Sequence, residues 1–124
     1  MADSAVTAKK SFDEPDEVLD LAKGRVQMVT IGGVTFDRSV FEPGWRWSEH
    51  VKPTVKTDSC EFPHQIIVTE GTLHVHMDDG IEFDVGPGEA AVIAPGHDAW
   101  VTSEIPCVMW GIDGDDRDWG KPTA

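Results

Sequence analysis

The most regular feature of the chain is a series of short runs in which apolar and polar residues alternate. From Arg25 onward the runs are rich in Val, Ile, Phe and Trp, and Gly, Pro and Asp separate them about every eight to twelve residues. Alternation with period two places successive side chains on opposite faces of a strand, so this spacing is typical of an antiparallel sandwich or barrel. The runs predict strands at 26–31, 34–41, 45–51, 64–69, 72–77, 81–85, 90–94, 98–103 and 106–112.

The clearest alternation lies in the segment 72–85, where two runs flank Asp78-Asp79-Gly80. Two alternating runs joined through Asp-Gly predict a β-hairpin. Its buried face would carry Leu73, Val75, Met77, Ile81, Phe83 and Val85. Its other face would carry His74, His76, Glu82 and Asp84, so both histidines are expected on the surface.

The two ends of the chain lack this pattern. The first dozen residues are small, polar and charged, which predicts a mobile tail. The segment DEPDEVLDLAKG predicts a short helix, because Asp13 or Glu14 can cap it, Pro15 suits its first turn and Gly24 can end it. We therefore expect an N-terminal tail and short helix at 1–24, a β-barrel at 25–113 and an acidic C-terminal tail at 114–124.

Composition narrows the choice of partners. The 124 residues suit one domain, and 10 basic residues against 23 acidic residues give a formal net charge of −13. Such a chain repels the phosphates of nucleic acids and the anionic headgroups of membranes, so neither is an expected partner. The sequence shows neither a secretory signal nor an apolar run that could cross a bilayer, which favours the cytoplasm, where its two cysteines are expected as free thiols.

Three short Gly- and Pro-containing segments resemble the cupin superfamily: Pro43-Gly44, Glu70-Gly71 and the stretch GPGEAAVIAPGH from Gly86 to His97. The resemblance spans about residues 36–112, and over this range the chain is similar to small single-domain bacterial cupins. It implies an all-β fold, a double-stranded β-helix of the RmlC-like jelly-roll type forming a cupin barrel, here with a short N-terminal helix.

The two cupin motifs are matched only in part. His50 follows Gly44 at the distance of the first motif, and His64 stands where the family has Glu. Lys52 replaces the second His of that motif, and the segment between His50 and His64 is longer than the pattern. In the second motif Ala99 or Trp100 occupies the His position, while His97 lies nearby on the same strand face as Ala99.

The resemblance implies a metal site built from histidines. His50, His64 and His97 are the candidate ligands, and Cys60 is a candidate fourth ligand or neighbour of the site. Imidazoles suit divalent transition metals such as Fe, Zn, Ni or Mn, and an all-His set resembles the three-His iron sites of thiol and diketone dioxygenases among the cupins. Alternatively, each His is a polar residue in the barrel mouth, hydrogen-bonded to a Trp or to a backbone carbonyl.

A ligand pocket is predicted beside these histidines, and its candidate residues are Trp45, Trp47, Lys52 and Trp100. The indole rings would form an aromatic wall, and Lys52 would pair with a substrate carboxylate. Core packing of the tryptophans and a solvated lysine are the alternatives. Since Trp45 and Trp47 alternate out of phase with His50, a bulge or bend near Ser48 is needed if all are to line one cavity.

Three functions follow as hypotheses. The first is a metal-dependent enzyme, an oxygenase or an isomerase acting on a small organic molecule. The second is a non-catalytic module that binds or senses a small molecule. The third is a structural partner, and a homodimer is expected in any case because exposed strands of such barrels pair across a two-fold axis.

Overall fold

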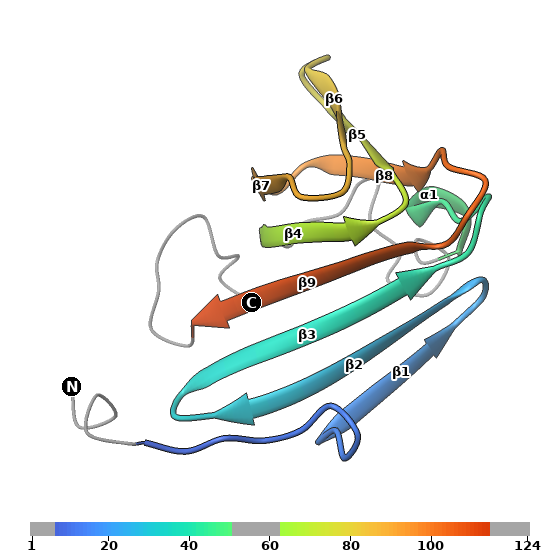
Figure 1. Ribbon diagram of the computed structural model, residues 1–124. Helices are drawn as coiled ribbons and strands as arrows, with labels where there is room; N and C mark the ends of the chain where they lie inside the picture. Colours follow the sequence, from blue (N-terminus) through green and yellow to red (C-terminus); the bar gives the residue numbers. More distant parts are fainter. Residues whose placement is uncertain (1–6, 51–62, 115–124) are drawn as a thin grey trace.

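The computed structural model describes residues 7–50 and 63–114, the side chains of His50 and Asp113 excepted, and these residues form two antiparallel sheets (Figure 1). The larger sheet has the strand order β1-β2-β3-β9-β4-β7 and the smaller has the order β6-β5-β8. The strands are β1 Glu17–Leu21, β2 Gly24–Ile31, β3 Val34–Phe41, β4 His64–Glu70, β5 Leu73–Met77, β6 Glu82–Val85, β7 Ala90–Ile93, β8 His97–Val101 and β9 Cys107–Gly114. The predicted all-β class is confirmed, and every predicted strand except that at 45–51 is present.

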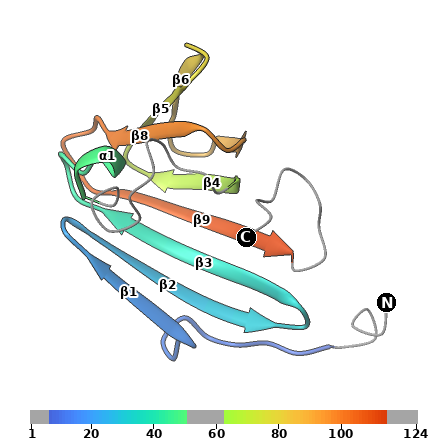
Figure 2. The ribbon, with the colours of Figure 1, turned by 180° about the vertical axis from the view of Figure 1, so that it is seen from behind.

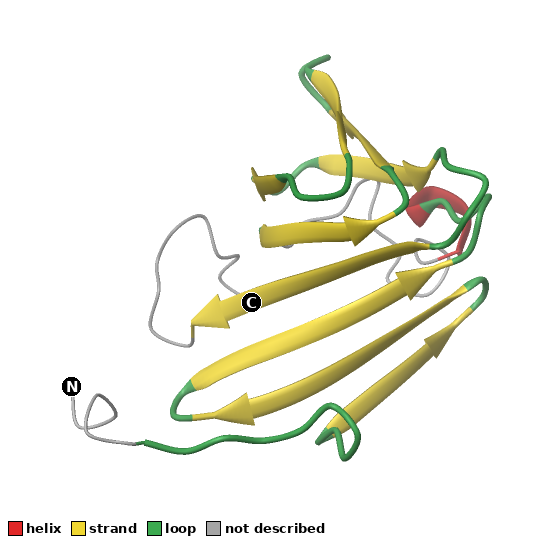
Figure 3. Cartoon of the chain, viewed as in Figure 1, coloured by secondary structure: helices red, strands yellow, loops and turns green. Residues whose placement is uncertain are grey.

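Helix is almost absent from the described part of the chain, as Figure 3 shows. Its one helix, α1, spans Trp47–His50. Nowhere in residues 7–50 and 63–114 is there a helix with the length and apolar character needed to cross a membrane.

The short helix predicted within 1–24 is wrong, because Glu17–Leu21 form strand β1 instead. β1 pairs with β2 through a tight turn in which Leu21 faces Gly24 and Lys23 takes a φ of 60°. The spacing of Val18 and Leu21 fits a helix, whereas that of Leu19 and Leu21 fits a strand. An element of five residues is too short for periodicity to decide between the two.

The strand predicted at 45–51 is also wrong. A single bridge joins Arg46 to Trp100 of β8, and the chain then turns into α1. Asp98 of β8 holds this turn, since its carboxylate accepts the Ser48 backbone N–H at 3.1 Å and the Arg46 Nε–H at 3.3 Å. Hydrogen bonds to the Asp98 side chain thus take the place of the backbone hydrogen bonds that a further strand would form with β8.

The core lies between the two sheets. Alternation sends Ile66 and Val68 of β4 inward, and Ala99 and Val101 of β8 meet them from the smaller sheet. At the end where β3 finishes, the Phe41 ring stacks on the Trp45 ring with centroids 3.9 Å apart. Burial of an apolar side chain such as Val, Ile or Phe contributes about 1.5–3 kcal/mol.

The predicted hairpin is present as β5 and β6, with Leu73 opposite Val85 and Val75 opposite Phe83. Its apolar face is buried only in part. Leu73, Val75 and Val85 are in the core, whereas Ile81 and Phe83 are 59% and 37% exposed. The two ribbon views show why, because the tip of this hairpin projects beyond the larger sheet (Figures 1 and 2).

Candidate functional site

Two histidines from different sheets meet in the interior. His64 is the first residue of β4 and shares its inward face with Ile66 and Val68. His97 is the first residue of β8 and shares its inward face with Ala99. The centroids of the two imidazole rings lie 5.2 Å apart, and the ring planes make an angle of 68°. Of the candidate ligands predicted from sequence, the structure brings these two together.

The orientation of His97 is fixed by the main chain. Its side chain is buried, and Nδ1 lies 2.8 Å from the carbonyl oxygen of Ala94, which can only accept a hydrogen bond. Nδ1 therefore carries the proton, and Nε2 is the nitrogen with the lone pair. A backbone carbonyl here performs the orienting role that a carboxylate performs in many metal sites.

His64 is held in its neutral form. Burial lowers the pKa of His64 to about 4, and the neighbouring His97 contributes to the same shift, because a second positive charge would be unfavourable there. A neutral imidazole is the form that binds metal ions, so at neutral pH this ring needs no deprotonation to act as a ligand.

The segment that leads to His50 runs alongside β8. After the bridge between Arg46 and Trp100, the Ser48 N–H bonds to Asp98, so the chain passes along β8 toward the end that carries His97. The side chain of His50 lies outside the described residues, as do Lys52 and Cys60 entirely. Their predicted roles as ligands and pocket residue stay predictions.

The tryptophans predicted to line the pocket divide between two faces. Trp45 and Trp47 are buried in the core, at 4% and 6% exposure. Trp100 differs from the prediction, because it occupies the opposite face of β8 from His97. There its ring contacts the rings of His74 and His76 and lies 4.1 Å under the guanidinium carbon of Arg46. Trp100 is therefore outside the interior site.

The inward face of the larger sheet also carries a carboxylate that the sequence reasoning missed. Asp37 of β3 pairs with Gly111 of β9, which in turn pairs with the buried Ile66. Both carboxylate oxygens of Asp37 would lie 2.8 Å from a Cβ on Gly111, so the carboxylate lies across β9 in the space left by the missing side chain. The sequence shows only that Asp37 lies within the alternating run 34–41, and its pairing with Gly111 comes from the structure.

Among the described side chains, which do not include those of His50 and Asp113, no set of three His, Cys, Asp or Glu gathers in a way that could hold a metal. The arrangement within these residues is a pair of inward imidazoles. Cys107 does not join them as a thiolate, since burial raises the pKa of its thiol to about 11.

Comparison with known proteins reveals structural likeness only. No family model and no curated protein sequence matches the chain. A sugar phosphate isomerase from a cupin superfamily, from Silicibacter pomeroyi, superposes with a TM-score of 0.52 and 19% identity over 73% of this chain, which spans 58% of that protein's length. The polyketide cyclase RemF from Streptomyces resistomycificus gives a TM-score of 0.61 with 16% identity over 96% of this chain and 87% of its own.

The cupin domain of an XRE family transcriptional regulator from Enterobacter cloacae has a TM-score of 0.56 and 14% identity, with 77% of this chain and all 100% of that domain covered. At such identities the likeness identifies the architecture.

Proposed function

The chain has the cupin fold, and on that premise we propose that its interior binds one divalent transition metal through His64 and His97 and acts on a small organic molecule there. The observation that carries the proposal is the pair of inward imidazoles from opposite sheets, with ring centroids 5.2 Å apart.

The geometry of the pair fits a shared ion. Two imidazoles bound to one ion at about 2.1 Å, with a tetrahedral angle between them, have ring centroids roughly 5 Å apart. The observed separation of 5.2 Å agrees with this value. The proton on Nδ1 of His97 leaves Nε2 as the donor nitrogen, and burial keeps His64 neutral. The chemistry of the donor set therefore matches Fe, Zn, Ni or Mn.

Two imidazoles need further ligands to complete such a site, and His50 is the first candidate because α1 follows β8 toward the end that carries His97. Cys60 is the second candidate. When bound, the metal would supply Lewis-acid or oxygen-activating chemistry.

Exclusion of water and binding of the substrate would depend on other side chains of the protein. Trp47 and Ile93, which are buried in the core, would exclude water from the site. Asp37, whose carboxylate lies across Gly111 on the inward face, would accept a hydrogen bond from a substrate hydroxyl. These side chains would bind and orient a small oxygenated molecule.

The reaction class is an isomerisation or an oxygenation. Two structural neighbours are named as an isomerase and a cyclase, which supports chemistry on small organic molecules. The identity of the metal would separate the two classes, because iron favours oxygenation whereas zinc or nickel is compatible with isomerisation.

Elemental analysis of the full chain, purified without a metal-binding tag, tests the proposal. The wild type is expected to hold about one transition metal per chain, and His64→Ala and His97→Ala should each lower that content at least about tenfold. His76→Ala is the matched control, because His76 is on the outer face of β5 near Trp100 and should leave the metal content unchanged.

A wild type with far less than one metal per chain after incubation with Fe, Zn, Ni and Mn would contradict the proposal. If a small molecule then stabilised the protein equally with and without chelator, the chain would be a metal-free binding module.

A further inference from the structure

The hairpin of β5 and β6 carries apolar side chains beyond the core, on the face that points into the interior. Phe83 pairs with the buried Val75, yet Phe83 is 37% exposed and Ile81 is 59% exposed. Met77, at the end of β5, is partly buried and packs against the core. Alternation keeps these side chains on the face that Val75 shares. We call Met77, Ile81 and Phe83 the apolar hairpin surface.

The apolar hairpin surface continues directly from His97. Met77 is the cross-strand partner of His97, and the Met77 N–H donates to the Ile81 carbonyl oxygen at 2.7 Å. Ile81, Met77 and His97 therefore form one row across the smaller sheet. Neighbouring strands lie about 4.8 Å apart, so Ile81 is about 10 Å from His97 along this row. The surface thus begins at one of the two inward imidazoles and leads away from it.

Within the described residues the larger sheet leaves this surface open. The tip of the hairpin extends past the larger sheet in both ribbon views (Figures 1 and 2). An exposed apolar side chain is common on its own, but several that adjoin a candidate site are typical of a surface that binds a ligand. Continuity with His97 indicates the occupant, because a molecule held at the imidazole pair would extend over these side chains.

Carboxylates border the surface at the turn of the hairpin. Asp78 and Asp79 are both exposed there. The Asp78 N–H donates to the Gly96 carbonyl oxygen at 2.9 Å, which joins the turn to the residue before His97. Negative charge at this position repels anionic groups, and the net charge of −13 acts in the same direction. The surface therefore favours an uncharged apolar group.

We propose that the apolar hairpin surface binds the apolar part of the substrate, an uncharged alkyl or aryl group joined to the oxygen-bearing end that the metal holds. The inference rests on the proposed function, because it takes that polar end to lie between His64 and His97. It adds the substrate class, an amphipathic molecule whose apolar part extends about 10 Å over Met77 and Ile81. A phosphorylated sugar has neither the apolar group nor the required charge.

Hydroxamates of two chain lengths test the inference on the zinc-loaded full chain, because both chelate the metal and only the apolar chain differs. Isothermal titration calorimetry gives the Kd of each. Octanohydroxamate should bind at least about 30-fold more tightly than acetohydroxamate, since its additional CH2 groups leave water on the surface. In the double variant Ile81→Thr/Phe83→Thr, octanohydroxamate should lose at least about tenfold in affinity, whereas acetohydroxamate should stay within about twofold.

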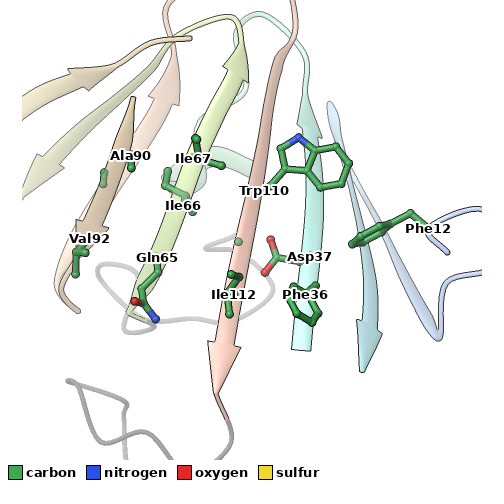
Figure 4. A pocket seen from close by; sticks show the side chains of 12 residues that line it. Phe12, Phe36, Asp37, Gln65, Ile66, Ile67, Ala90, Val92, Trp110 and Ile112 are labelled. Carbon is green, nitrogen blue, oxygen red and sulfur yellow. The ribbon is translucent and has the colours of Figure 1, made fainter. Parts of the chain in front are cut away.

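The matched control lies on the outer face of the larger sheet, away from the interior. Val92 is 72% exposed there and lines a shallow apolar groove of about 440 Å³ together with Ile112 (Figure 4). Val92→Thr, like Ile81→Thr, replaces an exposed β-branched apolar residue by Thr, and both Kd values should stay within about twofold of the wild type. If the double variant does not fold, Ile81→Thr alone takes its place, with an expected loss of about three- to fivefold.

Methyl NMR spectra in the presence of a chelator separate this inference from the proposed function. Octanamide, which has the same alkyl chain, should shift the methyl signals of Met77 and Ile81 more than those of Val92, whereas acetamide should not. If the chain binds no zinc but shows these shifts, the metal proposal fails and the apolar hairpin surface stands. On the zinc-loaded chain, a Kd ratio below about threefold, or a ratio that the double variant keeps, would overturn the inference. On a chain that binds no zinc, shifts of Met77 and Ile81 no larger than those of Val92 would overturn it.

Discussion

Gly71, the residue after β4, has a φ of 74° and lies against the backbone at the start of β9. A Cβ there would lie 2.5 Å from the Pro106 carbonyl oxygen and 2.7 Å from Cys107 Cα. Gly71→Ala therefore combines backbone strain with a clash that flexible side chains cannot relieve, and we expect it to destabilise the fold by about 3 kcal/mol or more.

Gly88 is the control for this prediction, because its φ is 84° but no atom lies within 4 Å of an added Cβ. Gly88→Ala should cost only the strain, about 1–2 kcal/mol. Urea denaturation of both variants measures the difference. Equal losses would show that the contact with Pro106 and Cys107 is relieved by movement of the chain.

At the scale of single residues, the sequence allowed the inward pair to be predicted, because alternation determines the face of each strand residue. Alternation places His97 and Ala99 on one face of β8 and Trp100 on the other, so the same rule excludes Trp100 from the interior. The hydrogen bond from His97 to Ala94 could not be predicted, since it depends on how the chain turns before β8. Asp37 required knowledge of the pairing between β3 and β9.

At the scale of elements, strands with clear alternation were predictable and short elements were not. The hairpin of β5 and β6 follows from its pattern and its Asp-Gly turn. β1 and α1 are set by tertiary contacts, because β1 exists as the partner of β2 and α1 is held by Asp98. No local periodicity in so few residues carries that information.

The outer face of the same hairpin carries a histidine held between two carboxylates. His74 Nδ1 lies 2.8 Å from Asp84 Oδ1, and Nε2 lies 2.7 Å from Glu82 Oε1. Partial burial by itself lowers the pKa of His74. The hydrogen bonds and negative charges of Asp84 and Glu82 outweigh this effect, so the pKa is raised. Trp100 packs on the ring, and Arg46 lies beyond it. Protonated His74 therefore fastens β6 to β5.

This contact predicts a pH dependence of stability. A raised pKa means that the stabilisation is complete below the ordinary pKa of 6.5 and is lost as pH rises through the pKa of the folded state. His74→Gln should lower the melting temperature by a few degrees, corresponding to about 1 kcal/mol, near pH 6 and by less above pH 8.

Thermal melts of the wild type, His74→Gln and the control His76→Gln between about pH 5.5 and 9 test this expectation. The control should follow the wild-type curve, because the carboxylates of Asp84 and Glu82 bond to His74 and not to His76. Parallel curves for the wild type and His74→Gln would contradict it.

At the scale of the whole molecule, the net charge of −13 opposes compactness as well as association. NaCl at about 0.3 M shortens the range of the repulsion to well under 10 Å. We expect the melting temperature to rise by about 2–5 °C between low salt and this concentration at pH 7.5. Near pH 4.5, where the sequence predicts no net charge, the rise should vanish. A melting temperature that falls with NaCl at pH 7.5 would contradict the expectation.

The hydrogen bond between His97 and the Ala94 carbonyl has a consequence for how this segment tolerates change. Because the acceptor is the main-chain carbonyl of residue 94, it remains whichever side chain occupies that position. It moves relative to the imidazole when the number of residues between 94 and 97 changes. In a library of variants, substitutions at position 94 should therefore be common among active clones. Deletions or insertions between residues 94 and 97 should be absent from the active clones, so this segment is constrained by its length rather than by the identity of residue 94.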